Sequence, residues 1–294
     1  MIEIRALRKT YADGHQALNG IDLDIHDGML GLLGPNGAGK TTFLSALTMI
    51  LEPTSGSRIY DGLDASRASN RSAIRRMIGY LPQDFTPIRH LSGFDYLVYC
   101  AQLRGLKLSI HRIRERAHQL LDAVFLQEAA FRRSGEYSGG MRRRLGIAQA
   151  LIHSPRLVVV DEPTAGLDPE ERIRFRNLIA DVAEDRAVLL STHIVEDIEA
   201  TCPRIVVIGR GEILFDGEPA ELLRRASGKL WDIESGSDLP SGARIISERA
   251  EEGRRLTLVL SEAPVPGGVL RDVTLEEAYS AFLAGQGVSR DEQA

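Results

Sequence analysis

The stretch Gly34-Pro35-Asn36-Gly37-Ala38-Gly39-Lys40-Thr41-Thr42 decides the fold of this 294-residue chain. It matches the pattern G-x-x-x-x-G-K-[ST] at every fixed position. An apolar run at 29–33 precedes it and apolar residues at helical spacing follow it, so a strand, a glycine-rich loop and a helix are predicted in this order. Successive backbone N–H groups at a helix N-terminus form a concave anion site. The stretch therefore predicts a nucleotide site rather than an ordinary glycine-rich turn.

Each residue type in this loop has a chemical use. Gly37 and Gly39 lack a Cβ, so the backbone can curl close to a phosphate. The ammonium group of Lys40 is expected to reach the β- and γ-phosphates, and the hydroxyl of Thr41 is expected to ligate Mg²⁺. The predicted contacts with the nucleotide include the whole loop, that is Gly34, Pro35, Asn36, Gly37, Ala38, Gly39, Lys40, Thr41 and Thr42.

The composition is that of an ordinary globular protein, with 43% hydrophobic and 26% charged residues. A net charge of −5 gives no general case for nucleic-acid binding. Cys100 and Cys202 sit in no metal-ligand spacing, which favours free thiols in a reducing cytosol. No apolar stretch approaches the roughly 20 residues of a membrane helix, and no signal peptide is expected at the N-terminus. Any role at a membrane would therefore require a partner.

The chain begins with strand patterns at 2–7 and 21–25, but the character of the sequence changes at about 84–155. There the strand signals vanish, which predicts a helical subdomain inserted in an α/β domain. A block of basic residues usually marks a solvated helix face, and this is the expectation for Arg142, Arg143 and Arg144. The predicted helices of this subdomain span 94–106, 110–126 and 139–152.

Strand patterns return with the apolar run 157–160, which is typical of a buried parallel strand. The sequence then predicts that the α/β domain extends over 1–220 and that a small accessory α+β domain covers 221–294, whose last helix starts with the capping box at 274–277. The further predicted elements are helices at 169–184, 193–200 and 217–228, a strand at 188–190, a hairpin at 204–216, and strands at 230–233 and 256–260.

Polar residues follow several of these strands. Asp161 is expected to face the Mg²⁺ presented by the glycine loop, whereas Glu162 points elsewhere and is free to polarise a water. His193 follows the strand at 188–190, on the edge where ligands bind in α/β folds. Gln83 ends another strand and could ligate Mg²⁺ or position water. For each of these residues an ordinary charged turn, loop or structural position remains the alternative.

A second phosphate-binding feature is predicted at Ser138-Gly139-Gly140. Ser138 suits the N-cap of a helix, and the two glycines leave bare N–H groups at its first turn. A flexible turn is the alternative. Asp168 precedes a proline that suits the first position of a helix, so it fits either a helix N-cap or a site residue. The turn at 11–18 carries an aromatic residue, Tyr11.

The order of these features resembles the ATP-binding-cassette (ABC) ATPase family over about residues 1–220. The matching motifs are Walker A at 34–42, the Q-loop at Gln83, the signature at 137–141, Walker B at 157–162, the D-loop at Asp168 and the switch histidine at His193. Tyr11 resembles the aromatic residue that stacks on adenine. The resemblance implies a P-loop NTPase cassette with a mixed sheet core, an antiparallel β subdomain and an inserted helical subdomain.

The same resemblance implies a head-to-tail homodimer, in which ATP bound at 34–42 of one subunit is covered by 138–140 of the other. Glu162 would be the general base, His193 would hold the γ-phosphate and Gln83 would sense Mg²⁺. The family signature usually has Leu and Gln where this chain has Tyr137 and Met141. Because Ser-Gly-Gly is intact, the ATP sandwich is expected to survive.

Two classes of function compete within the family. A single cassette whose C-terminal end near 273–279 resembles ABC-2-type exporters of drugs or antibiotics favours a transporter ATPase. Such a subunit would work with a separate transmembrane permease and lie peripherally at the cytoplasmic face of the inner membrane. The alternative is a soluble ABC ATPase acting on ribosomes or DNA. That class typically carries two cassettes or a long coiled coil, and neither is expected here, so no nucleic-acid partner is predicted.

Overall fold

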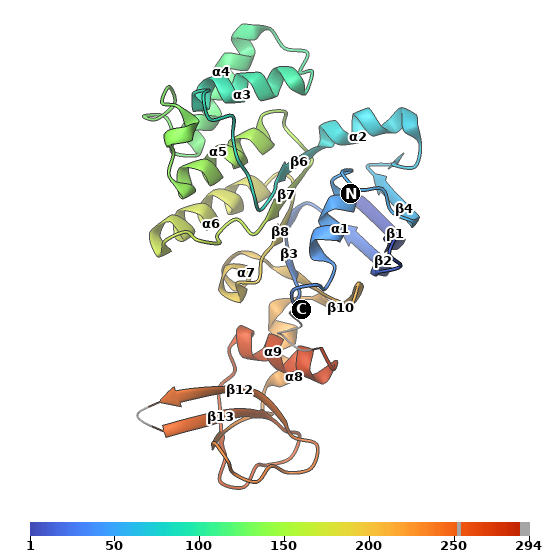
Figure 1. The fold of residues 1–294 in the computed structure, drawn as a ribbon, viewed down its shortest axis with the longest axis vertical. Helices are drawn as coiled ribbons and strands as arrows, with labels where there is room; N and C mark the ends of the chain where they lie inside the picture. The colour runs from blue at the N-terminus through green and yellow to red at the C-terminus, as the bar shows by residue number, and fades with distance from the viewer. Residues whose placement is uncertain (252–253, 289–294) are drawn as a thin grey trace.

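The computed structural model describes residues 1–251 and 254–288. A six-stranded sheet in the order β10-β9-β3-β8-β7-β6 forms the centre of the cassette (Figure 1). Its strands run parallel except for β10, which pairs antiparallel with β9. The strands are β3 (Gly28–Leu33), β6 (Ile78–Leu81), β7 (Leu157–Asp161), β8 (Ala187–Ser191), β9 (Arg204–Gly209) and β10 (Glu212–Gly217).

The parallel strands carry continuous apolar runs because both of their faces are covered. Every residue of β7 and β8 is buried. In the register of these strands Asp161 lies opposite Ser191, and Ser191 also lies opposite Leu32 of β3. The carboxyl ends of three strands therefore meet at one edge of the sheet. The helices that follow these strands are α1 (Lys40–Leu47), α6 (Pro169–Ala183) and α7 (Val195–Thr201).

A second, antiparallel sheet in the order β2-β1-β4-β5 packs against α1. It confirms the strands predicted at 2–7 and 21–25, although both are longer than expected. Helix α2 (Arg71–Met77), which begins after a 3-10 turn at Ala68–Asn70, was not predicted, because its short basic sequence buries only Ile74. The strands of this sheet are β1 (Ile2–Thr10), β2 (Gln16–Ile25), β4 (Ser55–Tyr60) and β5 (Leu63–Asp64).

The predicted helical subdomain is present as α3 (Gly93–Leu103), α4 (Ile110–Ala123) and α5 (Gly139–Leu151) (Figure 1). A 3-10 turn, Ser134–Glu136, leads into α5. Each helix starts at a serine whose side chain accepts a hydrogen bond from a backbone N–H of the first turn, at Ser92, Ser109 and Ser138. These caps define where the helices begin, and the apolar stripe of α4 then packs into the core.

The expectation of a solvated face at Arg142–Arg144 is wrong. All three arginines are half-buried. Arg142 donates to the Tyr137 carbonyl at 2.8 Å, and Arg144 donates to the Phe125 carbonyl at 3.1 Å. Arg143 donates to three backbone carbonyls of two loops. Because a guanidinium group offers five N–H donors, such a run can fasten loops to a helix instead of facing water.

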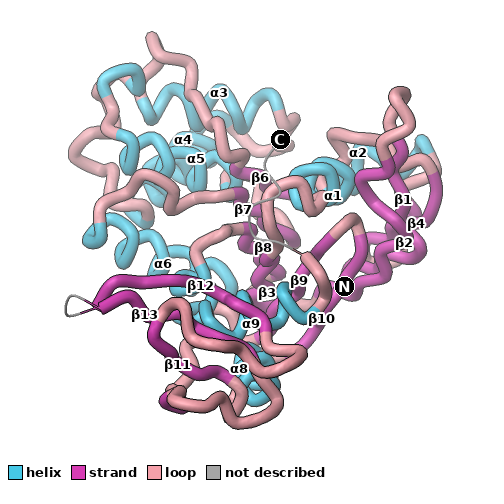
Figure 2. Tube along the Cα trace, turned by 60° about the horizontal axis from the view of Figure 1, so that its bottom comes forward, coloured by secondary structure: helices cyan, strands magenta, loops and turns pink. Residues whose placement is uncertain are grey.

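The accessory part contains a third sheet, in the order β12-β13-β11-β14, and two helices (Figure 2). Strands β12 and β14 were not predicted, because β12 is mostly exposed and β14 has two residues. Buried residues of both accessory helices, Leu222 and Tyr279, belong to the same core cluster as Val207. The elements are α8 (Pro219–Ala226), β11 (Leu230–Glu234), β12 (Arg244–Glu251), β13 (Arg254–Leu260), β14 (Val269–Leu270) and α9 (Leu275–Gly285).

No helix within the described ranges is both long enough and apolar enough to cross a membrane. Cys100 and Cys202 are free, as predicted, and burial raises the pKa of the Cys202 thiol to about 11.

Candidate nucleotide site

A cavity of about 990 Å³ opens at the carboxyl edge of the central sheet, and its size suits a nucleoside triphosphate. It brings together the glycine loop and the predicted residues of three other segments. The predicted residues that line it are Gly34, Pro35, Asn36, Gly37, Gly39, Lys40, Thr41, Thr42, Gln83, Asp161, Glu162 and His193.

The glycine loop leads directly into α1. Gly39 has a φ of +103°, and a Cβ there would lie 2.5 Å from the carbonyl oxygen of Ala17, so only glycine fits. The Lys40 ammonium group donates to the carbonyl oxygens of Gly34 and Pro35. Burial lowers the pKa of Lys40, and the nearby Glu162 and Asp161 oppose that shift. The loop thus holds a desolvated cation, for which phosphate oxygens are better partners than carbonyls.

Glu162 and His193 form a pair within this cavity. The Nδ1 atom of His193 lies 2.7 Å from Oε2 of Glu162. Glu162 is only 7% exposed, whereas the His193 side chain is 62% exposed. The Glu162 N–H donates to the Ser191 carbonyl, and its φ of +47° is an unusual conformation for a residue with a side chain. Strained backbone held in place by its surroundings is a feature of functional sites.

Asp161 supplies the carboxylate expected of a magnesium site. It is buried, and desolvation raises its pKa, so a bound cation would stabilise its charged form. Thr41 and Gln83, whose side chains carry a hydroxyl and an amide, line the same cavity. Carboxylate, hydroxyl and amide oxygens are the hard ligands that Mg²⁺ prefers. The residues present therefore fit the ion.

Tyr11 lies beside the cavity rather than among its lining residues. Its hydroxyl is 3.2 Å from the Thr42 hydroxyl, and its ring stacks on His15 with 6.3 Å between centroids. His15, from the same turn, and Ala17, at the start of β2, do line the cavity, and neither was predicted. The role of Tyr11 as the adenine-stacking ring stays a prediction, and His15 joins it as a candidate.

Besides Tyr11, five predicted residues do not line this cavity, namely Ala38, Ser138, Gly139, Gly140 and Asp168. Ser138 caps α5 by accepting from the Met141 N–H at 3.1 Å, which confirms the predicted N-cap. Asp168 likewise caps α6 by accepting from the Glu171 N–H at 2.8 Å. Ala38, within the loop, is buried. The second phosphate-binding feature is thus outside the first cavity of its own subunit.

Arg143 supports the site from outside the cavity, and the sequence did not indicate this role. Its guanidinium donates to the carbonyls of Gln83 at 3.2 Å, Glu162 at 2.9 Å and Ala165 at 3.3 Å. It therefore joins the helical subdomain to the segments that carry two predicted site residues. The sequence gives no sign that Arg143 differs from Arg142 and Arg144, because the partners of Arg143 are backbone atoms of residues far away in the sequence.

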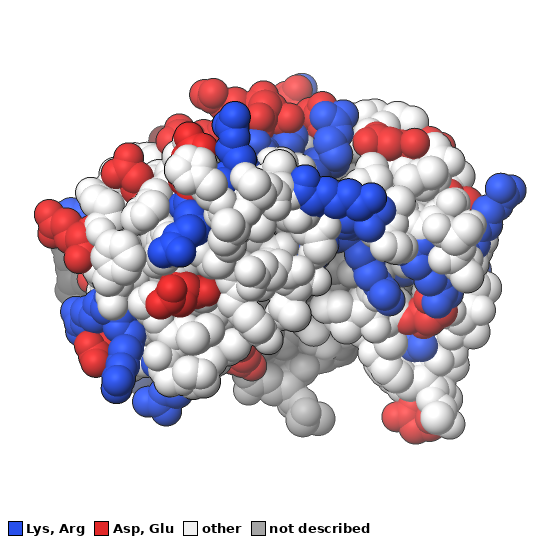
Figure 3. All heavy atoms as spheres, turned by 90° about the horizontal axis from the view of Figure 1, so that it is seen from above, with Lys and Arg blue, Asp and Glu red and all other residues white. Residues whose placement is uncertain are grey.

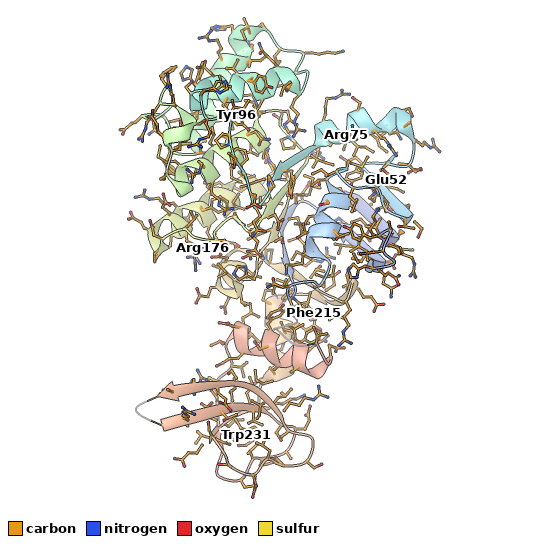
Figure 4. All side chains as sticks on the ribbon, in the orientation of Figure 1. Glu52, Arg75, Tyr96, Arg176, Phe215 and Trp231 are labelled. Carbon is orange, nitrogen blue, oxygen red and sulfur yellow. The ribbon has the colours of Figure 1, made fainter. Side chains whose placement is uncertain are left out.

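Asp197 was also not predicted. Its side chain is almost fully buried, and Oδ2 accepts a 2.5 Å hydrogen bond from the Thr164 hydroxyl. Arg176 of α6 lies 3.6 Å from Oδ1 (Figure 4). Thr164 follows Glu162 by two residues, and Asp197 follows His193 by four. This hydrogen bond is a second tie between the two segments that carry the Glu162–His193 pair.

Removing this tie is expected to slow ATP turnover. Thr164→Val deletes a charge-assisted hydrogen bond of about 1.5–3 kcal/mol, so we expect kcat to fall about 10-fold while KM for ATP changes little. Asp197→Asn keeps an acceptor and should lose less. The matched control is Thr201→Val, because that hydroxyl donates to the backbone oxygen of Asp197. Steady-state ATPase assays showing equal losses in Thr164→Val and Thr201→Val would contradict the positioning role.

The fold and the cavity together define a P-loop nucleotide-hydrolysing protein, since a Walker-type loop, a buried aspartate and a glutamate–histidine pair converge at one sheet edge. Comparison with known proteins identifies the family. The family model for "ABC transporter" matches residues 18–165, and the chain belongs to that family.

Relatives and solved structures agree with this assignment. The chain is 39% identical to the doxorubicin resistance ATP-binding protein DrrA of Mycobacterium tuberculosis, over 79% of this chain and 70% of that protein. It is 36% identical to the Nod factor export ATP-binding protein I of Cupriavidus metallidurans, over 81% and 75%. A phosphonates import ATP-binding protein matches at 36%. The dimeric post-hydrolysis structure of the cassette MJ0796 with ADP and Pi superposes with a TM-score of 0.68 at 26% identity, covering 74% of this chain and 98% of MJ0796.

These findings confirm the predicted family, the P-loop cassette fold and the ATPase activity. The chain is an ATP-binding and ATP-hydrolysing subunit of a transporter, and cassettes of this family work as dimers with a membrane subunit.

Proposed function

We propose that this subunit powers export through a separate membrane-spanning permease, and that it does so as a head-to-tail dimer at the cytoplasmic face of the membrane. The names of the DrrA and Nod factor relatives support resistance and export, although an import protein is similarly close. The observation that carries the dimer is the separation of two phosphate-binding features. The cavity holds the Walker loop, whereas Ser138–Gly140 lies outside it.

Within each site, the residues of one chain would have separate roles in binding and hydrolysing ATP. Lys40 and the loop N–H groups bind the phosphates, and Glu162 accepts the proton of the attacking water. His193, held by Glu162 at 2.7 Å, is placed to donate to the γ-phosphate. Mg²⁺, held by Thr41, Asp161 and Gln83, would neutralise charge on the phosphates. The Ser138 cap and the glycines of a second copy would complete the site from the other side.

A groove between the antiparallel-sheet side of the cassette and the helical subdomain suits a permease segment. It lies where α1, β6 and the end of α3 meet, and it combines apolar and cationic side chains. Ile50 is 67% exposed at its edge, and Arg104 bridges the subdomains by donating to the Arg75 carbonyl at 3.2 Å (Figure 4). The residues that line the groove are Thr48, Met49, Ile50, Arg75, Ile78, Tyr80 and Arg104. We propose that an amphipathic helix of the permease binds here.

The docking proposal is tested with the permease present. We expect Ile50→Asp to reduce permease-stimulated ATPase activity in vesicles several-fold while the basal rate stays unchanged. Ile173→Asp is the matched control, because Ile173 is 50% exposed on α6, outside the groove. Equal stimulation of both variants would contradict the docking site, and stimulation by ribosomes or DNA instead of a permease would contradict the transport function.

The alternative of a soluble ATPase acting on ribosomes or DNA has less support. Between Gln83 and Ser138 the helices α3 and α4 have only 11 and 14 residues, so no long coiled coil interrupts the cassette there. The face seen from the helical end mixes both signs of charge with wide uncharged areas (Figure 3). A surface that binds nucleic acid would instead carry a continuous basic patch.

A further inference from the structure

Ser191, the last residue of β8, lies between the two strands that lead into the nucleotide site. It pairs in register with Asp161 of β7 on one side and with Leu32 of β3, shortly before the glycine loop, on the other. Its carbonyl oxygen accepts a hydrogen bond from the Glu162 N–H at 2.8 Å. The backbone of Ser191 therefore helps to hold both acidic residues of the site.

The Ser191 hydroxyl is a polar group that the fold buries but does not pair. The residue is fully buried, and its Oγ atom has no hydrogen-bond partner among the residues that the structure describes. Register partners on neighbouring strands present their side chains to the same face of a sheet, so the hydroxyl lies on the face of the Asp161 carboxylate. Desolvation raises the pKa of Asp161, and the nearby Ser191 hydroxyl opposes that rise.

This unpaired hydroxyl is an exception within the described ranges. The other buried serine and threonine side chains there all form a hydrogen bond. Even the next residue, Thr192, accepts from the Ile194 N–H at 3.0 Å. A buried hydroxyl without a partner destabilises a fold. Its presence beside Asp161 therefore indicates a partner that is gained when the site is loaded.

We propose that Ser191 is a positioning residue of the Mg²⁺ site, and that its hydroxyl donates to the Asp161 carboxylate when the ion is bound. A carboxylate that ligates a metal keeps further acceptor sites, and a neighbouring donor usually holds it in orientation. The hydroxyl is already on the correct face of the sheet, next to a carboxylate that has been taken out of water. In the ion-free protein Ser191 thus gives up some stability so that Asp161 can be oriented.

This inference rests on the proposed Mg²⁺ site and not on the permease or the dimer. A wild-type chain that takes up no divalent cation together with the nucleotide would overturn the proposed metal site itself. A wild-type chain that takes up the cation, with no effect of the Ser191 hydroxyl, would overturn only the inference. The two failures are therefore distinguishable.

The first test measures metal affinity without hydrolysis. Mn²⁺, which suits the same oxygen ligands as Mg²⁺, is titrated into the protein carrying a non-hydrolysable ATP analogue, and electron paramagnetic resonance reports the unbound Mn²⁺. We expect Ser191→Ala to weaken Mn²⁺ binding about 10-fold. The affinity for the analogue without metal should stay unchanged, because the backbone bond between Ser191 and Glu162 is kept.

Ser134→Ala is the matched control for this titration. Ser134 is also a fully buried serine, but it lies outside the cavity and its hydroxyl donates to the Ile88 carbonyl at 2.9 Å. We expect this control to bind Mn²⁺ like the wild type. Wild-type Mn²⁺ affinity in Ser191→Ala, or an equal loss in Ser134→Ala, would overturn the proposal.

A second test separates a positioning role from a structural one by thermal unfolding of the protein without nucleotide or metal. Ser191→Ala removes an unpaired hydroxyl, so its melting temperature should not fall. Ser134→Ala leaves the Ile88 carbonyl without its donor, so its melting temperature should fall by about 2–4 °C. An equal fall in both variants would show that the Ser191 hydroxyl serves the fold, and would overturn the proposal.

A third test asks whether the hydroxyl acts through Asp161. Two residues that act as a unit show losses that do not add when both are changed. We therefore expect Ser191→Ala to cause little further loss of Mn²⁺ affinity when it is introduced into Asp161→Asn. A further loss of about 10-fold in the double variant would mean that the hydroxyl acts independently of Asp161, which would contradict the proposal.

Discussion

Glu162→Gln lowers the rate of ATP hydrolysis by about 10²–10⁴-fold, the usual contribution of a general base, while ATP still binds. Glutamine has almost the same shape and can still hydrogen-bond His193, but it accepts no proton at neutral pH. The 2.7 Å contact between the two residues means that the substitution preserves the geometry of the site and removes its base. The variant is expected to accumulate as a closed, ATP-bound dimer.

Single-turnover assays and gel filtration with MgATP measure these two effects separately. Glu196→Gln provides the matched control, because Glu196 also lines the cavity but its side chain is 73% exposed. We expect that control to keep a rate within about threefold of wild type. Hydrolysis by Glu162→Gln at the wild-type rate would show that a group other than Glu162 accepts the proton of the attacking water.

Lys40→Ala abolishes nucleotide binding. The Lys40 ammonium group is half-buried against two loop carbonyls, and phosphate oxygens would take their place with charge-assisted hydrogen bonds. Two such bonds, at about 1.5–3 kcal/mol each, correspond to roughly a 10²–10⁴-fold weaker affinity. The loop keeps its shape, because its glycines and not the lysine set its backbone.

A fluorescent ATP analogue measures this loss directly. The control is Lys9→Ala, which removes a lysine 5.5 Å from the Tyr11 ring, outside the cavity. Because Lys9 lies near the ring that is expected to stack on adenine, that variant should lose at most a small part of its affinity for the ATP analogue. An affinity of Lys40→Ala equal to that of wild type would mean that the phosphates bind elsewhere.

The parts of the site that the sequence predicts are those built from local chemistry. The glycine loop, the apolar strand before Asp161 and the serine cap at Ser138 each depend on residues within one turn of the chain. Parallel strands present their carboxyl ends at one edge, so His193 and Glu162 could be expected near each other. The structure adds the direct contact between them.

The parts that the sequence did not predict depend on distant partners. Arg143 binds backbone carbonyls of residues up to 60 positions away, and Asp197 reaches Thr164 across 33 positions. Helix α9 adds Glu276 and Tyr279 to the cavity wall, and this contribution depends on how the accessory part packs against α7, which no local pattern encodes. The exposed strand β12 was not predicted for a different reason. Its sequence lacks the alternation of apolar and polar residues that is typical of a half-buried strand.

The central claim is that each ATP site is completed by a second copy of this chain. Gly139→Asp tests it, because a Cβ at Gly139 meets no atom within 4 Å and the added carboxylate would face the phosphates of the other subunit. Lys40→Ala and Gly139→Asp should each be inactive alone. Mixed in equal amounts, they form heterodimers with one intact site, and ATPase activity should return to about a quarter of wild type. A mixture no more active than the separate variants would contradict the composite site.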